Sequence, residues 1–406
     1  HMNFAPVLDV NSQPANPIIG ARAFGESPEL VEALGTAYID GLQAAGVAAT
    51  AKHFPGHGDV TVDSHLDLPR VEHDLDRLLA VELRPFASAA RAGVAAVMTA
   101  HIVHPAVDPS GVPATMSTPM LTGVLRERLG YRGLVLTDSM SMRAIVDHFG
   151  VGEAAVLAVA AGCDVILALG PEALQREIID HLAEAIDSGR IPGNRVAEAV
   201  DRLAGASARW GLARPHDAGP HPRGEAGRVN LTDVVGTDEH LAVARRIAEA
   251  AITLVRDRAG VIPLKDRAIG LLPVTPKTVD DPTLATALRR RGARARGVEV
   301  GDDLSSVDLV IAVTCTRGAP RPSDVATVRN LHGRLGDRLI VVATGDPYDV
   351  LSFPDVPAYV ATYGTDSFTL EATARVLLGE IPPSGRLPVT LPGLHLAGQA
   401  STPNAP

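Results

Sequence analysis

The sequence predicts an α/β protein: a (β/α)8-type TIM barrel, of which only about five of the eight strands are visible, followed by an α/β sandwich domain. Three observations support this fold class. Short apolar runs alternate with segments of helical periodicity up to residue 213, and polar residues gather where the runs end. A proline-rich break then separates this half from a second alternating half.

Five apolar runs in the first half are predicted to form a parallel sheet. They are short and nearly continuously apolar, as strands buried on both faces are. Apolar residues recur at helical spacing between the runs, so each connection is expected to be a helix. We expect strands at Asn3–Val10, Ala48–Pro55, Ala95–His101, Gly133–Ser139 and Cys163–Leu169, and helices within 27–46, 74–93, 118–130 and 141–162.

Polar side chains gather at the C-terminal ends of these predicted strands. Asp9, Lys52, His53, His101 and Asp138 stand where apolar runs stop. In an α/β barrel all strands end on the same face, and that face carries the chemistry. The pattern therefore favours an active site on this face.

The chain is expected to divide into a partial barrel domain at 1–213, a linker at 214–236 and a sandwich domain at 237–400. The text "RPHDAGPHPR" has three prolines and no apolar period, which is typical of a linker. A capped amphipathic helix is predicted over 237–257, followed by strands at Ala268–Val274, Asp308–Thr314, Arg338–Thr344 and Ala358–Thr362. No Gly-x-Gly-x-x-Gly follows a strand, so a dinucleotide site is not expected.

Composition excludes several classes of function. The formal net charge of −10 argues against a nucleic-acid partner, which would need a concentrated basic surface. No apolar run is long enough to suggest a membrane span. The two cysteines, Cys163 and Cys315, lie in apolar runs and are expected to be reduced core residues.

The segment "DSH", which is Asp63, Ser64 and His65, follows a glycine-rich turn and is expected to lie in a loop above the strand ends. A carboxylate on one imidazole nitrogen fixes the tautomer and raises the basicity of the other nitrogen, so the pair could transfer protons. The alternative is an Asp that turns the chain beside an exposed His.

Metal binding is a second interpretation of this region. The proline and glycine of "HFPGH" preclude the helix that would aim His53 and His57 at one ion, and the chain has no H-E-x-x-H and no Cys cluster. We therefore expect no metal and no cofactor. The candidate ligands considered are His53, His57, Asp59, Asp63 and His65.

Asp138 directly follows the apolar strand "GLVLT". Alone, it could be a helix N-cap, and Lys52 could be the partner of a buried carboxylate. When Asp138 is considered together with the Lys52–His53 strand end and the Asp63–His65 loop, a catalytic role becomes the favoured interpretation. Retaining glycoside hydrolysis needs an anionic nucleophile and a separate proton donor, which Asp138 and His65 could supply. Fixed charged donors such as Arg22, Lys52 and His53 suit sugar hydroxyls.

The sequence also resembles glycoside hydrolase family 3, in its β-N-acetylglucosaminidase branch. The resemblance is carried by "KHFPGHGDVTVDSH", "NFAPVLDV", "NPIIGARAFG", "GLVLTDSMSM" and "AGCDVILAL", and in the second half by "GEIPPSGRLPVTLPG". It implies that Asp138 is the nucleophile, that His65 is the acid/base and that Asp63 orients it. It also implies that Arg22, Lys52 and His53 contact the N-acetylglucosamine.

The function expected from this resemblance is a retaining exo-β-N-acetylglucosaminidase that acts on small carbohydrates or muropeptides from peptidoglycan. Two alternatives stay open. A histidine acid/base repels phosphate less than a carboxylate would, so the enzyme could be a phosphorylase. The incomplete barrel could instead leave an impaired sugar-binding protein.

The first strand visible here resembles the fourth strand of the family's barrel, and an open sheet would expose apolar edges. A trimmed chain, a preceding segment or a natural variant completed by another chain would each explain this, and self-association could cover the edges. The opening His1–Met2 resembles a cloning remnant, which leaves the native start and any signal peptide unknown. The compartment stays open, with export or attachment to the cell envelope favoured.

Overall fold

The computed structural model describes residues 1–63, 67–211, 233–275 and 283–399. The chain splits into two compact units, His1–Gly219 and Pro220–Pro406. Most of the predicted linker falls in 212–232, outside the described residues. None of the helices in the described ranges is long and apolar enough to cross a bilayer.

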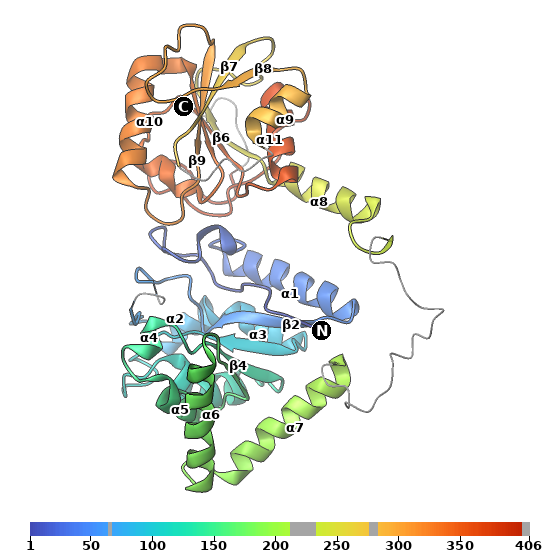
Figure 1. Cartoon of the computed structure of the whole chain (residues 1–406), viewed down its shortest axis with the longest axis vertical. Coiled ribbons are helices and arrows are strands. Elements are labelled where there is room, and N and C mark those ends of the chain that lie inside the picture. Colours follow the sequence, from blue (N-terminus) through green and yellow to red (C-terminus); the bar gives the residue numbers. More distant parts are fainter. Residues whose placement is uncertain (64–66, 212–232, 276–282, 400–406) are drawn as a thin grey trace. The chain divides into compact units, whose positions relative to one another are not determined.

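The N-terminal unit is built on a curled sheet of parallel strands in the order β1-β2-β3-β4-β5 (Figure 1). Helices connect successive strands, and α1 packs against α3 while α5 packs against α6. The predicted parallel βα architecture is confirmed, with β1 and β5 at the edges of the described sheet. The strands are Met2–Asn3, Ala48–Phe54, Ala96–Thr99, Leu134–Ser139 and Val165–Leu167.

The helices of this unit are α1 (Pro28–Ala44), α2 (Leu75–Ala80), α3 (Leu83–Arg91), α4 (Arg143–Val146), α5 (Val151–Ala161), α6 (Glu172–Asp187), α7 (Gly193–Trp210) and the π-helical segment η3 (Pro119–Arg128). Local sequence explains their ends. Ser27 caps α1 by accepting a hydrogen bond from the backbone N–H of Leu30, and Pro28 occupies the first turn, where its missing N–H costs nothing.

The predicted strand Asn3–Val10 is wrong over most of its length. The regular strand ends at Asn3, and only an isolated bridge between Val7 and Lys52 continues it. Pro6 has no N–H to donate, which interrupts the ladder. The segment still follows β2, because the backbone N–H of Leu8 donates to the carbonyl of Lys52 over 2.6 Å. This irregular course delivers Asp9 to the end of β2.

A buried carboxylate secures the β4–β5 edge of the sheet. The side chain of Asp164 is completely buried and accepts hydrogen bonds from Arg126 over 2.7 Å, from Arg202 over 3.0 Å and from the backbone N–H of Val135 over 3.0 Å. A guanidinium nitrogen of Arg195 also donates to it. Because Arg195 and Arg202 belong to α7, this one carboxylate connects the last helix of the unit to the sheet.

The C-terminal unit contains a six-stranded sheet in the order β6-β11-β10-β9-β7-β8 (Figure 1). All neighbours are parallel except β6, which runs antiparallel to β11. The strands are Thr253–Asp257, Ala268–Pro273, Arg294–Gly297, Leu309–Thr314, Leu339–Ala343 and Ala358–Ala361, and the helices are α8 (Asp238–Ala251), α9 (Leu284–Arg290), α10 (Pro322–Leu335) and α11 (Ser367–Leu378).

The two faces of this sheet bury separate apolar clusters, as expected for an α/β sandwich. Along β10, Ile340 and Val342 belong to one cluster while Leu339 and Val341 belong to the other. Successive side chains of a strand point to opposite faces, so both faces must be covered. Helices α9 and α11 lie on one side and α10 on the other (Figure 1). The predicted sandwich fold is confirmed.

Two sequence predictions need correction in this unit, and one of its strands was missed. The helix expected over 237–257 ends at Ala251, because β-branched residues follow and form β6, Thr253–Asp257. Strand β8, Arg294–Gly297, was not predicted, since an exposed, arginine-rich edge strand has no apolar pattern. Both cysteines are free, but only Cys163 is fully buried, so the core assignment is wrong for Cys315.

Candidate active site

A cavity of about 250 Å³ opens at the C-terminal ends of strands β2, β3 and β4. Four of the six predicted site residues line it: Arg22, Lys52, His53 and Asp138. The parallel order of these strands explains the gathering, because their carboxyl ends meet on one face. The remaining lining residues are Phe4, Ile18, Ile19, His57, Met98, Leu167 and Leu169.

Asp138 lies near the end of β4, where its side chain is half-buried. One carboxylate oxygen accepts a hydrogen bond from the backbone N–H of Ser139 over 2.7 Å. The next helix, α4, begins at Arg143 and has Met142 at its N-cap position. Asp138 is therefore not the cap of that helix, and its carboxylate belongs to the cavity.

His53 is held by the buried carboxylate of Asp9. Its Nδ1 donates to one oxygen over 2.7 Å and its backbone N–H donates to the other over 3.1 Å. The backbone N–H of His57 donates to that second oxygen over 2.7 Å. A proton on Nδ1 leaves Nε2 of the neutral ring as an acceptor, 3.5 Å from a guanidinium nitrogen of Arg22. Asp9 thus selects the tautomer that can hold Arg22.

The charge of Asp9 is stabilised despite its burial. Burial alone would raise the pKa of Asp9, but the attraction and hydrogen bond of His53, together with the N–H of His57, hold the pKa below its ordinary value. His57 behaves differently: burial lowers its pKa to about 4, so this ring is neutral near pH 7. The sequence placed Asp9 at a strand end, but nothing in it indicated these partners.

Lys52 projects from β2 and also lines the cavity. Burial, and then the positive charge of Arg22, lower the pKa of Lys52, while Asp138 and Asp9 oppose that shift. The ammonium group therefore acts on the carboxylate of Asp138 through partly desolvated space, where charge interactions are stronger than in water.

The turn after β2 depends on two glycines. A Cβ on Gly58 would lie 1.8 Å from the carbonyl oxygen of Val10, so no larger residue fits. Gly56 has φ +139°, and a Cβ there would lie 2.8 Å from the Cβ of Glu82. These approaches hold the turn against both the Asp9 segment and the start of α3.

The predicted proton-transfer loop is only partly described. Asp63 is half-buried, and its carbonyl accepts a hydrogen bond from the backbone N–H of Asp67 over 3.0 Å. His65 and Ser64 lie in 64–66, outside the described residues. The role of the Asp63–His65 pair therefore stays a prediction.

His101, the remaining strand-end histidine, connects two strands rather than lining the cavity. Its Nε2 lies 3.1 Å from the carbonyl oxygen of Ser139 and donates to it, and its Nδ1 lies 2.8 Å from the hydroxyl of Thr115. The ring is buried. It joins the ends of β3 and β4 and so supports the backbone that carries Asp138.

Of the metal ligands considered from the sequence, Asp59 alone belongs to the group that the described residues bring together. His53 and His57 do approach each other, with ring centroids 6.0 Å apart, although no helix aligns them. Within the described residues, the group close enough to hold a metal ion consists of Asp59, His73 and Glu82. None of the three lines the cavity.

Comparisons with known proteins agree with this geometry. The Glycosyl hydrolase family 3 N terminal domain matches residues 1–206. The chain belongs to glycosyl hydrolase family 3. It is 30% identical to a β-hexosaminidase A of Pseudoalteromonas piscicida, over 96% of this chain and 74% of that protein. It is 29% identical to a β-N-acetylglucosaminidase/β-glucosidase of Cellulomonas fimi, over 95% of this chain and 73% of that protein.

The family 3 assignment extends to the fold of the whole described chain. A solved family 3 β-N-acetylglucosaminidase from Paenibacillus sp. str. FPU-7 superimposes with a TM-score of 0.84 at 36% identity. The match covers 96% of this chain and 76% of that structure. The barrel-type sheet and the sandwich unit of this family 3 chain therefore both have counterparts in a solved relative.

Proposed function

We propose that this family 3 chain is a retaining exo-β-N-acetylglucosaminidase that releases terminal N-acetylglucosamine from small β-linked substrates, with peptidoglycan fragments as the substrate class. The observation that carries the proposal is the cavity in which Asp138, Lys52, Arg22 and His53 meet. Relatives named β-hexosaminidase and β-N-acetylglucosaminidase support the choice of sugar.

The size of the cavity supports attack on a terminal sugar. At about 250 Å³ it is small, compared with roughly 300–1,000 Å³ for typical small-molecule sites. A space of this size accommodates one ring rather than an internal stretch of a polymer. Cationic and imidazole groups on its wall can hydrogen-bond the sugar hydroxyls.

The proposed reaction proceeds in two displacements. Asp138 attacks the anomeric carbon and forms a glycosyl-enzyme ester while the glycosidic C–O bond breaks and His65 protonates the leaving oxygen. His65 then removes a proton from water, and the oxygen of that water attacks the same carbon and releases Asp138. Two inversions at one carbon retain the β configuration.

Replacement of Asp138 by Asn tests the proposal. We expect hydrolysis of an aryl β-N-acetylglucosaminide to be abolished, because the neutral amide cannot form the ester. Asp187→Asn, at the exposed end of α6, is the matched control and should be fully active. A near-normal rate for Asp138→Asn would refute the assignment.

Two further measurements test the stereochemistry of the reaction and the acceptor in its second displacement. Proton NMR of the first product formed should show the β-anomer, and the α-anomer would exclude retention. Turnover with added phosphate should yield free N-acetylglucosamine, whereas the sugar 1-phosphate as main product would identify a phosphorylase.

A further inference from the structure

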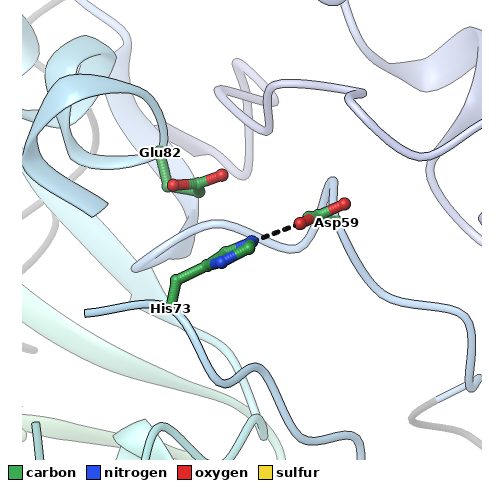
Figure 2. Close-up of side chains that lie close together, drawn as sticks. All are labelled: Asp59, His73 and Glu82. Atoms are coloured by element: carbon green, nitrogen blue, oxygen red, sulfur yellow. Dashed lines mark hydrogen bonds and ion pairs between the residues drawn. The ribbon is translucent and has the colours of Figure 1, made fainter. Parts of the chain in front are cut away.

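Outside the cavity, Asp59, His73 and Glu82 bring three potential ligand atoms together from separate parts of the N-terminal unit (Figure 2). Asp59 follows the glycine-rich turn after β2, His73 precedes α2, and Glu82 immediately precedes α3. Figure 2 shows the imidazole of His73 directed at Asp59, with the carboxylate of Glu82 beside both. We propose that these three side chains form a binding site for a divalent transition-metal ion of the zinc type.

The spacing of the ligand atoms fits such an ion. All three lie within 4.8 Å of one another, and Nε2 of His73 is 2.5 Å from Oδ2 of Asp59. Bonds of about 2.1 Å at tetrahedral angles place ligand atoms about 3.4 Å apart. The observed distances between ligand atoms therefore lie on both sides of the distance that tetrahedral coordination requires, and small side-chain movements would allow an ion to bind.

The backbone positions of two ligands are restricted before any ion binds. Asp59 is adjacent to Gly58, which packs against the carbonyl of Val10. Glu82 is only 2% exposed, and Gly56 packs directly on its Cβ. A ligand set held in this way loses little conformational entropy when it binds.

The charges near the cluster are compatible with a dication. Asp59 and Glu82 contribute two negative charges, and Arg77 contributes one positive charge through hydrogen bonds of 2.8 and 2.7 Å to the two oxygens of Glu82. With His73 neutral, the group keeps a net charge of −1. Each carboxylate oxygen has a second lone pair, so Arg77 orients a ligand in the way that outer partners of metal ligands commonly do.

His104 provides a second, independent observation. It is 2% exposed, and neither ring nitrogen has a hydrogen-bond partner in the described part of the chain. Burial, and then the nearby rings of His73 and His57, lower its pKa to about 4, so the ring is neutral and keeps a free lone pair. A buried imidazole of this kind calls for an ion or water as its partner.

The donor set selects the class of metal. One imidazole nitrogen and two carboxylate oxygens suit Zn²⁺, Co²⁺ or Mn²⁺, whereas Mg²⁺ and Ca²⁺ prefer oxygen ligands throughout. None of these residues lines the cavity, so the ion would not touch a sugar bound there. The ion would connect Asp59 and His73, which lie on either side of 60–72, to Glu82 at the start of α3.

Calorimetric titration of the chelator-treated full chain with Zn²⁺ tests the proposal. We expect one equivalent to bind, a raised melting temperature, and at least a tenfold loss of affinity in His73→Gln and in Asp59→Asn. Mg²⁺ should not compete. The matched control is His148→Gln, which removes an exposed His–Asp pair of 3.0 Å with Asp67 and should leave affinity unchanged.

The same protein preparation shows that the test of the metal site is independent of the proposed function. Asp138→Asn should bind Zn²⁺ as the wild-type chain does, so a failed glycosidase assignment would leave this result intact. If the variants do not fold, Zn²⁺ should still protect His73, but not His148, from diethyl pyrocarbonate in the wild-type chain. Absence of stoichiometric binding, equal weakening by His148→Gln, or no protection of His73 would overturn the proposal.

Discussion

Replacing Asp9 by Asn tests whether one buried carboxylate organises the cavity. Asp9 accepts hydrogen bonds of 2.7 and 3.1 Å from the ring and backbone of His53, and one of 2.7 Å from the backbone of His57. An amide of the same shape has one acceptor oxygen and two donor hydrogens. If that oxygen keeps both backbone N–H groups, the NH₂ faces the Nδ1–H of His53, and two donors meet.

The magnitude follows from these three contacts. Loss of the charge-assisted bond to His53 costs roughly 1.5–3 kcal/mol. The two bonds to backbone N–H groups also weaken, because charge-assisted bonds are about twice as strong as neutral ones. If each of those two backbone bonds loses about 1 kcal/mol, the three losses together come to about 3–5 kcal/mol. We therefore expect the free energy of unfolding of the N-terminal unit to fall by about 3–5 kcal/mol.

The chain contains a natural probe for this measurement. Its single tryptophan, Trp210, ends α7 of the N-terminal unit, so urea unfolding can be followed by fluorescence. The KM for an aryl N-acetylglucosaminide should also rise. The donor clash is relieved if the proton of His53 moves to Nε2, and that nitrogen can then no longer accept from Arg22.

The acid dependence gives a further check on Asp9. Its pKa is lowered in the folded chain, so its contribution to stability is present above its ordinary pKa and is lost as pH falls through the folded value. Asp9→Asn should lack that acid-dependent loss, while Asp187→Asn should behave as wild type. A loss of unfolding free energy below about 1 kcal/mol with an unchanged KM would refute this account.

Two other predictions concern separate parts of the chain. Burial raises the pKa of Asp349 to about 6, against opposing hydrogen bonds from Thr314, Tyr359 and Thr316. The folded form therefore binds the proton more tightly, and the C-terminal unit should lose about 3 kcal/mol of stability as pH rises from about 4 to 6. Melting temperatures across this range should show the loss in wild type and not in Asp349→Asn; equal slopes would contradict it. Lys52→Met should lower kcat/KM for the aryl substrate about 10- to 100-fold, as expected for a lost charged hydrogen bond, and a change below about threefold would argue against sugar contact.

Local pattern was sufficient for much of the fold and for part of the site. Strands β2, β4, β9 and β10 were predicted within one or two residues of their ends, because continuous apolar runs between turn residues are local signals. Errors arose where burial was one-sided or the ladder irregular, as in the charged edge strand β8 and the segment after β1. Such elements are defined by their neighbours in space.

The sequence by itself determined that Lys52, His53 and Asp138 share one face, because parallel strands end together. It also carried the family motifs. Only the tertiary structure decided which hydrogen-bond partners the side chains of these motifs have. Asp9 and His53 are 44 positions apart, and nothing in either segment indicates the hydrogen bond that selects the tautomer of His53.

The same reason applies to the cluster of Asp59, His73 and Glu82. Asp59 was among the ligands that the sequence suggested, but His73 and Glu82 were not, and the spacing of the three residues matches no metal-binding pattern. Gly56 lets the turn after β2 approach Glu82 at the start of α3, and Gly58 lets the same turn approach Val10, more closely than a side chain would permit. Periodicity predicts elements, whereas such contacts depend on how the elements pack.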